Sequence, residues 1–314
     1  MAPVRIGTRA SALASWQTHH VIARWSLLEP GLKVAIVDLT TAGDDNPEAP
    51  LEVMEGTGFF TSTLERALLE GTIDVAVHSY KDLPVVSTPG LAVAAVPARG
   101  PVEDALCARD GLKLAALPPG ARVGTSSLRR VAQLRALRGD LDYRGLRGNV
   151  PTRLARVAGG DLDAIVLARA GLERLGLAGH VTEVFTVADL LPAPAQGALA
   201  VQARVDDRAV VERLAPLDDE PTRRAVTAER AVLHLLRGGC SVPVGALAHT
   251  DVAGVVVEAG VFAPAGDRAV LVRVTGTTPE EAGAEAARQL VAGGAREILA
   301  ALDRVPRVAG GVPS

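Results

Sequence analysis

The sequence predicts an α/β protein with two α/β lobes, followed by a separate α+β domain. Strand-like and helix-like segments alternate through about the first 200 residues, and such βαβ alternation is typical of a mostly parallel sheet. From about Asp219 the pattern changes to one helix followed by alternating strands. A length of 314 residues and a hydrophobic content of 48% allow two or three domains with buried cores.

The first lobe begins with an apolar strand and a helix whose hydrophobic residues recur at near-helical spacing. A capping box and a glycine stop mark its second helix. The predicted elements are a strand at Val4 to Ile6, a helix from Ser11 to Leu28, a strand at Val34 to Leu39, a helix opened by Ser62 to Glu65 and closed by Gly71, and a strand at Ile73 to Val77. The acidic segment from Asp38 to Glu55 predicts a surface loop.

The same alternation resumes in the second lobe and ends before the third domain. The second lobe is predicted to contain a strand at Arg122 to Gly124, a helix to about Arg138, a helix after Pro151 and a strand at Ala164 to Leu167, and a further strand is predicted at Leu199 to Ala203. The third domain is predicted to contain a helix with Ala225, Ala228, Val232 and Leu235 on one face, strands between Val244 and Thr275, and a helix capped by Thr278 to Glu281.

Several classes of protein do not fit the composition. No basic N-terminal segment precedes a long apolar run, and no stretch offers about 18 apolar residues, which predicts a cytoplasmic protein that does not contact the membrane. Cys107 and Cys240 have no metal-ligand spacing, so we expect two reduced thiols and no metal site. A net charge of -3, with four phenylalanines and two tyrosines, argues against a nucleic-acid partner, and no glycine-rich loop with nucleotide-binding spacing is present.

An arginine-rich segment is the first candidate binding site. Nine arginines lie between Arg122 and Arg156, against two aspartates. The stretch from Thr125 to Arg130 falls where a strand turns into a helix, so hydroxyls, backbone N–H groups and guanidinium groups could converge on an anion. Arginine grips carboxylates through two parallel hydrogen bonds, which favours a ligand with several carboxylates. The alternative is ordinary helix capping with solvated arginines.

Two other segments carry reactive groups. Val77 to Pro84 follows a buried strand and should lie at the carboxyl edge of a sheet, which makes Asp82 a candidate acid or base. The alternative is a surface turn with a Lys81/Asp82 pair and a His78 that is satisfied in the core. Cys240 follows a glycine helix stop beside an arginine, and this setting favours an accessible, nucleophilic thiolate. Cys107 lies in an apolar run, where a buried inert thiol is expected.

Six segments in this order resemble the hydroxymethylbilane synthase (porphobilinogen deaminase) family from end to end. They are Arg9 to Ser11, His78 to Pro84, Gly124 to Arg130, Leu146 to Asn149, Pro194 to Gly197, and Thr227 to Arg230 leading to Cys240. The resemblance implies a monomer of three domains, of which the first two are like periplasmic-type binding proteins and the third carries the cofactor cysteine. The expected boundaries are 1–97 with 198–216, 98–197, and 217–314.

By this resemblance, Cys240 holds a dipyrromethane, to which four porphobilinogen units are added with loss of ammonia before release as hydroxymethylbilane. Asp82 would contact the pyrrole nitrogens and shuttle protons. The resemblance assigns cofactor binding to Ser79, Lys81, Thr125, Ser127, Arg129, Arg130, Arg147 and Gln196, and binding of porphobilinogen and the growing chain to Arg9, Ser11, Arg147 and Arg153. Thr57 stands where the family often has lysine. A contact from this segment to a carboxylate of the ligand is therefore in doubt.

The main alternative is a non-enzymatic anion-binding protein with the same two lobes. Such a protein would explain the arginines and the crevice without catalysis. It predicts neither a loop carrying Cys240 nor a third domain, and it would need an export signal.

Overall fold

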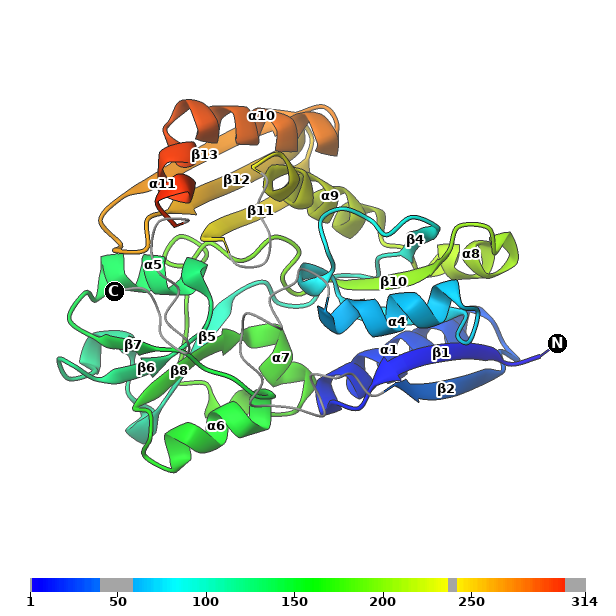
Figure 1. Cartoon of the computed structure of the whole chain (residues 1–314), viewed down its shortest axis with the longest axis horizontal. Coiled ribbons are helices and arrows are strands. Elements are labelled where there is room, and N and C mark those ends of the chain that lie inside the picture. The colour runs from blue at the N-terminus through cyan, green and yellow to red at the C-terminus, as the bar shows by residue number, and fades with distance from the viewer. Residues whose placement is uncertain (1, 40–58, 237–241, 303–314) are drawn as a thin grey trace. The chain divides into compact units, whose positions relative to one another are not determined.

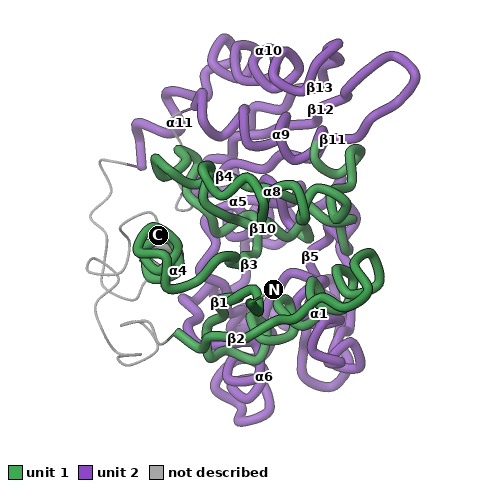
Figure 2. Tube along the Cα trace, turned by 90° about the vertical axis from the view of Figure 1, so that its right-hand side faces the viewer, with its two compact units in different colours: residues 1–100, 197–223 green, residues 101–196, 224–314 purple. Residues whose placement is uncertain are grey.

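The structure, a computed structural model, describes residues 2–39, 59–236 and 242–302. The chain divides into two compact units, one formed by residues 1–100 and 197–223 and the other by residues 101–196 and 224–314 (Figure 2). The first unit contains lobe 1, and the second contains lobe 2 together with the C-terminal domain. Three separate sheets confirm the predicted class of two α/β lobes and an additional domain (Figure 1). The finer domain boundaries stay a prediction.

Lobe 1 is a five-stranded sheet with helices on both faces. Its elements are β1 (Val4–Arg9), α1 (Ala12–Leu28), β2 (Val34–Leu39), α4 (Phe59–Leu69), β3 (Val75–Ser79), β4 (Leu91–Ala95), β10 (Leu199–Arg204) and α8 (Arg208–Leu214). The strand order is β2-β1-β3-β10-β4, with β1 parallel to β2 and β3, and with β10 antiparallel to β3 and β4. Four strands therefore run in one direction, and only β10 opposes them.

The core of lobe 1 has two parts, one on each face of the sheet. Trp25 of α1 and Leu214 of α8 are fully buried in the larger cluster, and Leu64 and Leu68 of α4 belong to the other. Strand β3 begins two residues later than predicted, because Asp74 accepts hydrogen bonds from the backbone and side chain of Arg5 just before the strand.

The predicted start of α4 is wrong. The helix begins at Phe59, so Ser62 lies within its first turn and is not the residue that precedes the helix. Glu65, which should complete the capping box, is buried, and its Oε1 accepts a hydrogen bond from Nε2 of Gln202 at 3.0 Å. A contact with a distant strand therefore replaces the local cap. Gly71 follows the helix with a φ of 67°, as a glycine stop requires.

Lobe 2 repeats this design. Its elements are β5 (Asp104–Ala108), β6 (Arg122–Gly124), α5 (Leu128–Leu137), β7 (Asp142–Arg144), α6 (Val150–Ala158), β8 (Ala164–Ala168), α7 (Arg169–Arg174) and β9 (Glu183–Val184). The order β7-β6-β8-β5-β9 is equivalent to that of lobe 1, and β5 is the antiparallel strand. One core cluster packs α5 on the sheet, and another packs α6 and α7.

The C-terminal domain is an antiparallel sheet with helices, as predicted. Its elements are α9 (Glu220–Leu235), β11 (Val244–Asp251), β12 (Gly254–Phe262), β13 (Ala269–Gly276), α10 (Pro279–Ala292) and α11 (Ala295–Leu302). The capping box of Thr278 and Glu281 is confirmed at the start of α10. Helices α9 and α10 pack closely, since a Cβ on Gly283 would lie 2.6 Å from the carbonyl oxygen of Ala228.

Candidate carboxylate-binding and catalytic site

In lobe 1 the predicted residues gather where parallel strands end. Strands β1 and β3 are hydrogen-bonded in parallel, so Arg9 and Ser79 end neighbouring strands at the same edge. Ser11 follows β1 and is the N-cap of α1, where its Oγ accepts the backbone N–H of Ala14 at 3.2 Å. The buried Gln17 of α1 donates from Nε2 to Oγ of Ser79 at 2.7 Å, which fixes the end of β3 against α1.

The segment after β3 forms one turn of 3-10 helix, Tyr80–Asp82. The N–H of Tyr80 donates to the carbonyl oxygen of Ala198 at 3.0 Å, and the N–H of Leu83 donates back to Tyr80 at 3.3 Å. Lys81 is half-buried in this turn, whereas Asp82 is exposed. The expected location of Asp82 at the carboxyl edge of the sheet is confirmed. A carboxylate that is exposed on a backbone-anchored turn can exchange protons with a ligand or with water.

In lobe 2 the equivalent turn lies between β6 and α5. Ser127 is the N-cap of α5, and the buried Thr125 accepts the N–H of Ser127 on its Oγ1 at 3.4 Å. Ser126 binds both backbone groups of Leu146, since its Oγ donates to the carbonyl oxygen at 2.7 Å and accepts the N–H at 2.8 Å. This pairing fixes the segment that precedes Arg147 beside the start of α5.

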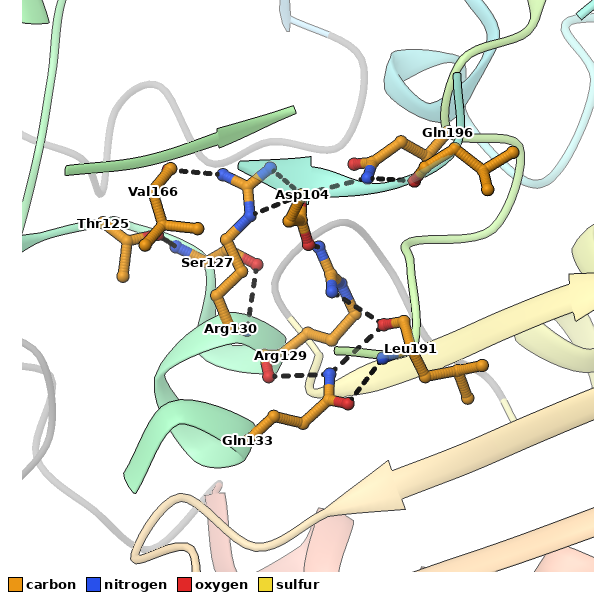
Figure 3. Close-up of polar contacts among 10 residues, drawn as sticks. Asp104, Thr125, Ser127, Arg129, Arg130, Gln133, Val166, Leu191 and Gln196 are labelled. Atoms are coloured by element: carbon orange, nitrogen blue, oxygen red, sulfur yellow. Dashed lines mark hydrogen bonds and ion pairs between the residues drawn. The ribbon is translucent and has the colours of Figure 1, made fainter. Parts of the chain in front are cut away.

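Arg129 and Arg130 point into the protein interior, so the alternative of solvated arginines is wrong for this pair. Nη2 of Arg129 donates to Oδ2 of Asp104 at 2.8 Å (Figure 3). Nε and Nη2 of Arg130 donate to Oδ1 of Asp104 at 3.0 and 2.6 Å. Sequence reasoning did not single out Asp104, although a charged residue that opens an apolar strand is a signal that could have found it.

The same carboxylate also binds Gln196. Its Nε2 donates to Oδ1 of Asp104 at 3.0 Å and to the carbonyl oxygen of Val102 at 2.7 Å (Figure 3). The preceding residue, Ala195, has a φ of 61°, which is unusual for a residue other than glycine. Its N–H donates to Oε2 of the buried Glu229 at 2.6 Å, a contact that holds this turn in place.

Two other predicted residues, Arg147 and Arg153, flank the start of α6. Asn149 is the N-cap of α6 and accepts the N–H of Thr152 on its Oδ1 at 3.0 Å. Nε of Arg153 donates to the carbonyl oxygen of Gly148 at 2.6 Å. Both arginines are half-buried, so part of each guanidinium-bearing side chain faces solvent.

The electrostatics distinguish the buried pair from the other arginines. Arg129 and Arg130 form their ion pairs in the interior, whereas those of Arg122, Arg138, Arg144 and Arg156 involve side chains that are partly exposed. Burial alone would raise the pKa of Asp104, but the two adjacent guanidinium groups outweigh it and hold that pKa well below its usual range. With two cations and one anion, the cluster carries a formal charge of +1.

Cys240 and Thr57 lie outside the described residues. The expectation for Cys107 is confirmed: the side chain is 2% exposed, and burial raises the pKa of its thiol to about 11. In the described part of the chain, no helix is long and apolar enough to cross a membrane. Among the same residues, no group of three His, Cys, Asp or Glu side chains could hold a metal ion.

Comparisons with known proteins cover most of the chain. Residues 4–212 match the model of the porphobilinogen deaminase dipyrromethane cofactor binding domain, and residues 223–292 match the porphobilinogen deaminase C-terminal domain. Among solved structures, a putative methionine-binding lipoprotein of Bacillus subtilis is similar with a TM-score of 0.43 and 12% identity, covering 68% of this chain and 89% of that chain.

Three curated relatives named porphobilinogen deaminase span most of the chain. The protein of Mycolicibacterium paratuberculosis is 56% identical over 78% of this chain and 76% of its own length. The protein of Nocardia farcinica is 49% identical over 95% of this chain and 88% of its own. The protein of Syntrophotalea carbinolica is 47% identical over 96% of this chain and 97% of its own. The chain therefore belongs to the porphobilinogen deaminase family.

Proposed function

We propose that this chain is a hydroxymethylbilane synthase, a transferase of tetrapyrrole biosynthesis. It joins four porphobilinogen molecules head to tail with loss of ammonia and releases the linear tetrapyrrole hydroxymethylbilane by hydrolysis. The dipyrromethane cofactor supplies the primer to which the first unit is added. The observation that carries this proposal is the buried cluster of Asp104, Arg129 and Arg130, which lies within the matched cofactor-binding domain and has a formal charge of +1.

The residues present fit a dipyrromethane. Its rings carry acetate and propionate groups, and an interior cluster that is one negative charge short of neutrality suits a carboxylate. Nε of Arg129 is buried and has no hydrogen-bond partner among the described residues, so a donor remains for such a group. We propose Ser79, Lys81, Thr125, Ser127, Arg129, Arg130, Arg147 and Gln196 as cofactor-binding residues and Cys240 as the point of attachment.

For the substrate and the growing chain, we propose Arg9, Ser11, Arg147 and Arg153 as the residues that bind carboxylates. Asp82 is the proposed catalytic residue. Each addition must lose ammonia and later remove a proton from a pyrrole ring, and a single exposed carboxylate on a fixed turn can give and take these protons.

The rival anion-binding protein is not favoured, because the family match includes the C-terminal domain, for which that function has no use. We further propose a cytoplasmic monomer without a nucleic-acid partner. The net charge of -3 and the confinement of the arginines to one segment support the last point.

Asp82→Asn tests the catalytic assignment. We expect the variant to melt near wild type and to lose at least ~10²-fold in turnover, since acid-base help is typically of that size or greater. Asp82→Glu keeps a carboxylate and should retain a small activity. Asp206→Asn, which changes an exposed carboxylate of the same lobe, is the control. If Asp82→Asn carries its full primer and stays within about tenfold of wild type, Asp82 is not the acid-base group.

Intact mass tests the attachment. The purified protein should exceed its sequence mass by one dipyrromethane, and Cys240→Ser should lose this adduct. Cys107→Ser should keep it, because that thiol is buried and protonated at neutral pH. An unmodified wild-type mass from cells that make porphobilinogen would contradict the proposed function.

A further inference from the structure

Asp104 is the centre of the buried cluster, although it carries none of the positive charge that attracts a carboxylate. It is fully buried at the first position of β5, and four N–H donors point at its two oxygens. Oδ1 accepts two hydrogen bonds from Arg130 and one from Gln196, whereas Oδ2 accepts one from Arg129 (Figure 3). A single carboxylate therefore orients both guanidinium groups.

Backbone carbonyls complete this arrangement. Nη1 of Arg130 donates to the carbonyl oxygen of Val166 at 3.0 Å, and Nη1 of Arg129 donates to that of Leu191 at 2.7 Å. Leu191 is itself held, because its N–H donates to Oε1 of Gln133 at 2.7 Å. A guanidinium group has five N–H donors, and Arg129 uses two of them in these contacts. Of the remaining three, the N–H at Nε is buried and has no hydrogen-bond partner among the described residues, so it is the donor left for a ligand.

A comparison within lobe 2 shows that the cluster is unusual. Asp163 also lies between two arginines, Arg109 and Arg122, but their side chains are 45% and 32% exposed. Water and the nearby carboxylates of Asp142 and Asp161 therefore compensate the positive charge around Asp163. The side chains of Arg129 and Arg130 are only 3% and 8% exposed, so water solvates their positive charge far less. An uncompensated charge in the interior is costly, and a further anion is the natural partner.

We propose that Asp104 is a positioning residue of the carboxylate-binding site. It holds the guanidinium groups of Arg129 and Arg130 in fixed planes and leaves the cluster one negative charge short of neutrality, so that one carboxylate of the pyrrole cofactor completes it. This inference rests on the proposed function and deepens it, because it names the residue that prepares the two arginines.

The variant Asp104→Asn should disturb orientation with almost no change in volume. If the amide oxygen takes the place of Oδ1, it still accepts from Arg130 and Gln196. The amide nitrogen then faces Nη2 of Arg129 at the 2.8 Å separation of the present hydrogen bond, with a donor against a donor. The reverse orientation places the amide nitrogen against three donors. Neither orientation holds both arginines.

The experiment measures how fast the cofactor-free protein gains the dipyrromethane mass when it is incubated with porphobilinogen. Asp104→Asn and the matched control Asp163→Asn are compared with wild type by intact mass, and the melting temperature of each cofactor-free form is recorded. We expect Asp163→Asn to load like wild type. We expect Asp104→Asn, while folded, to load at least about tenfold more slowly, which corresponds to ~1.4 kcal/mol.

A second variant covers the case in which Asp104→Asn does not fold. Gln196→Glu keeps Asp104 and both arginines but adds a negative charge beside Oδ1, which makes the cluster formally neutral. We expect slow loading at pH 8 and faster loading toward pH 6, because a protonated Glu at position 196 can donate to Asp104 as the amide does. If the cluster had a purely structural role, Gln196→Glu would change the melting temperature, but its loading rate would depend on pH in the same way as that of wild type.

The outcomes are distinguishable. If folded Asp104→Asn loads at the wild-type rate, or if Gln196→Glu loads like wild type throughout pH 6 to 8, the positioning role is wrong while the proposed function stands. If wild type itself gains no dipyrromethane mass, the proposed function fails, whatever the variants do.

Discussion

His78 should make lobe 1 sensitive to mild acid. It lies on β3 with its side chain 5% exposed, next to the segment that carries Asp82. Its pKa is lowered from 6.5 to about 4, chiefly by burial; a hydrogen bond with the Gln202 side chain partly opposes this shift, and the positive charge of Arg9 adds to it. Gln202 in turn donates a hydrogen bond to Glu65 of α4, so the imidazole has polar neighbours on β10 and β1.

The sign and size of the effect follow from this shift. Between pH 6.5 and about 4 the unfolded chain binds a proton at His78 that the folded chain does not, so stability falls as the pH falls through this window. A difference of about 2.5 pKa units corresponds to ~3 kcal/mol when the window has been crossed. Below pH 4 this group adds no further loss. Below pH 4, protonation of carboxylates with lowered pKa values, such as Asp104, causes the further loss of stability.

The assay is urea unfolding of wild type and His78→Gln from pH 7 to pH 4.5. Both tryptophans of the chain, Trp16 and Trp25, lie in α1, so tryptophan fluorescence reports lobe 1 even if the two units unfold separately. His78→Gln should lack most of the decline of wild type, whereas His19→Gln, at an exposed position of α1, should retain it. Parallel curves for wild type and His78→Gln would refute the reasoning.

Three further substitutions test packing in the second unit by calorimetry or urea unfolding. Gly245→Ala should cost ~1–3 kcal/mol, because the new Cβ would lie 2.9 Å from the carbonyl oxygen of Leu191; an unchanged stability would show that this contact yields freely. Leu106→Ala, at a fully buried position of β5, should cost about 2–5 kcal/mol. Thr278→Ala should cost about 1 kcal/mol through loss of the cap that Glu281 shares, and a cost near zero would contradict that role.

Local signals in the sequence predicted local features of the fold. The cap predicted at Thr278 involves residues three positions apart, so a short stretch of sequence contains the whole interaction; the N-caps observed at Ser11 and Ser127 have the same spacing. The predicted start of α4 was wrong because it assumed a local cap, whereas Glu65 binds a residue 137 positions away in the sequence. Short strands such as β4 and β9 were missed, since they depend on pairing with distant strands.

The site shows the same limit. The strand-to-helix turn that carries the arginines was predicted, and so was the turn that carries Asp82. The role of Asp104 was not, because its partners lie 25, 26 and 92 residues away; the local sequence marks it only as a charged residue that opens an apolar strand. The orientation of Arg129 and Arg130 toward the interior was not predicted either, because it depends on their ion pairs with Asp104.

The strand order has a consequence for synthesis of the protein on the ribosome. Strand β10 lies between β3 and β4, so lobe 1 cannot close its sheet until residue 204 has been made. All five strands of lobe 2 lie between residues 104 and 184, and that sheet can form earlier. The middle of the nascent chain should therefore become resistant to proteases before the beginning does. Until then β3 and β4 present unpaired edges, the kind of surface that chaperones shield.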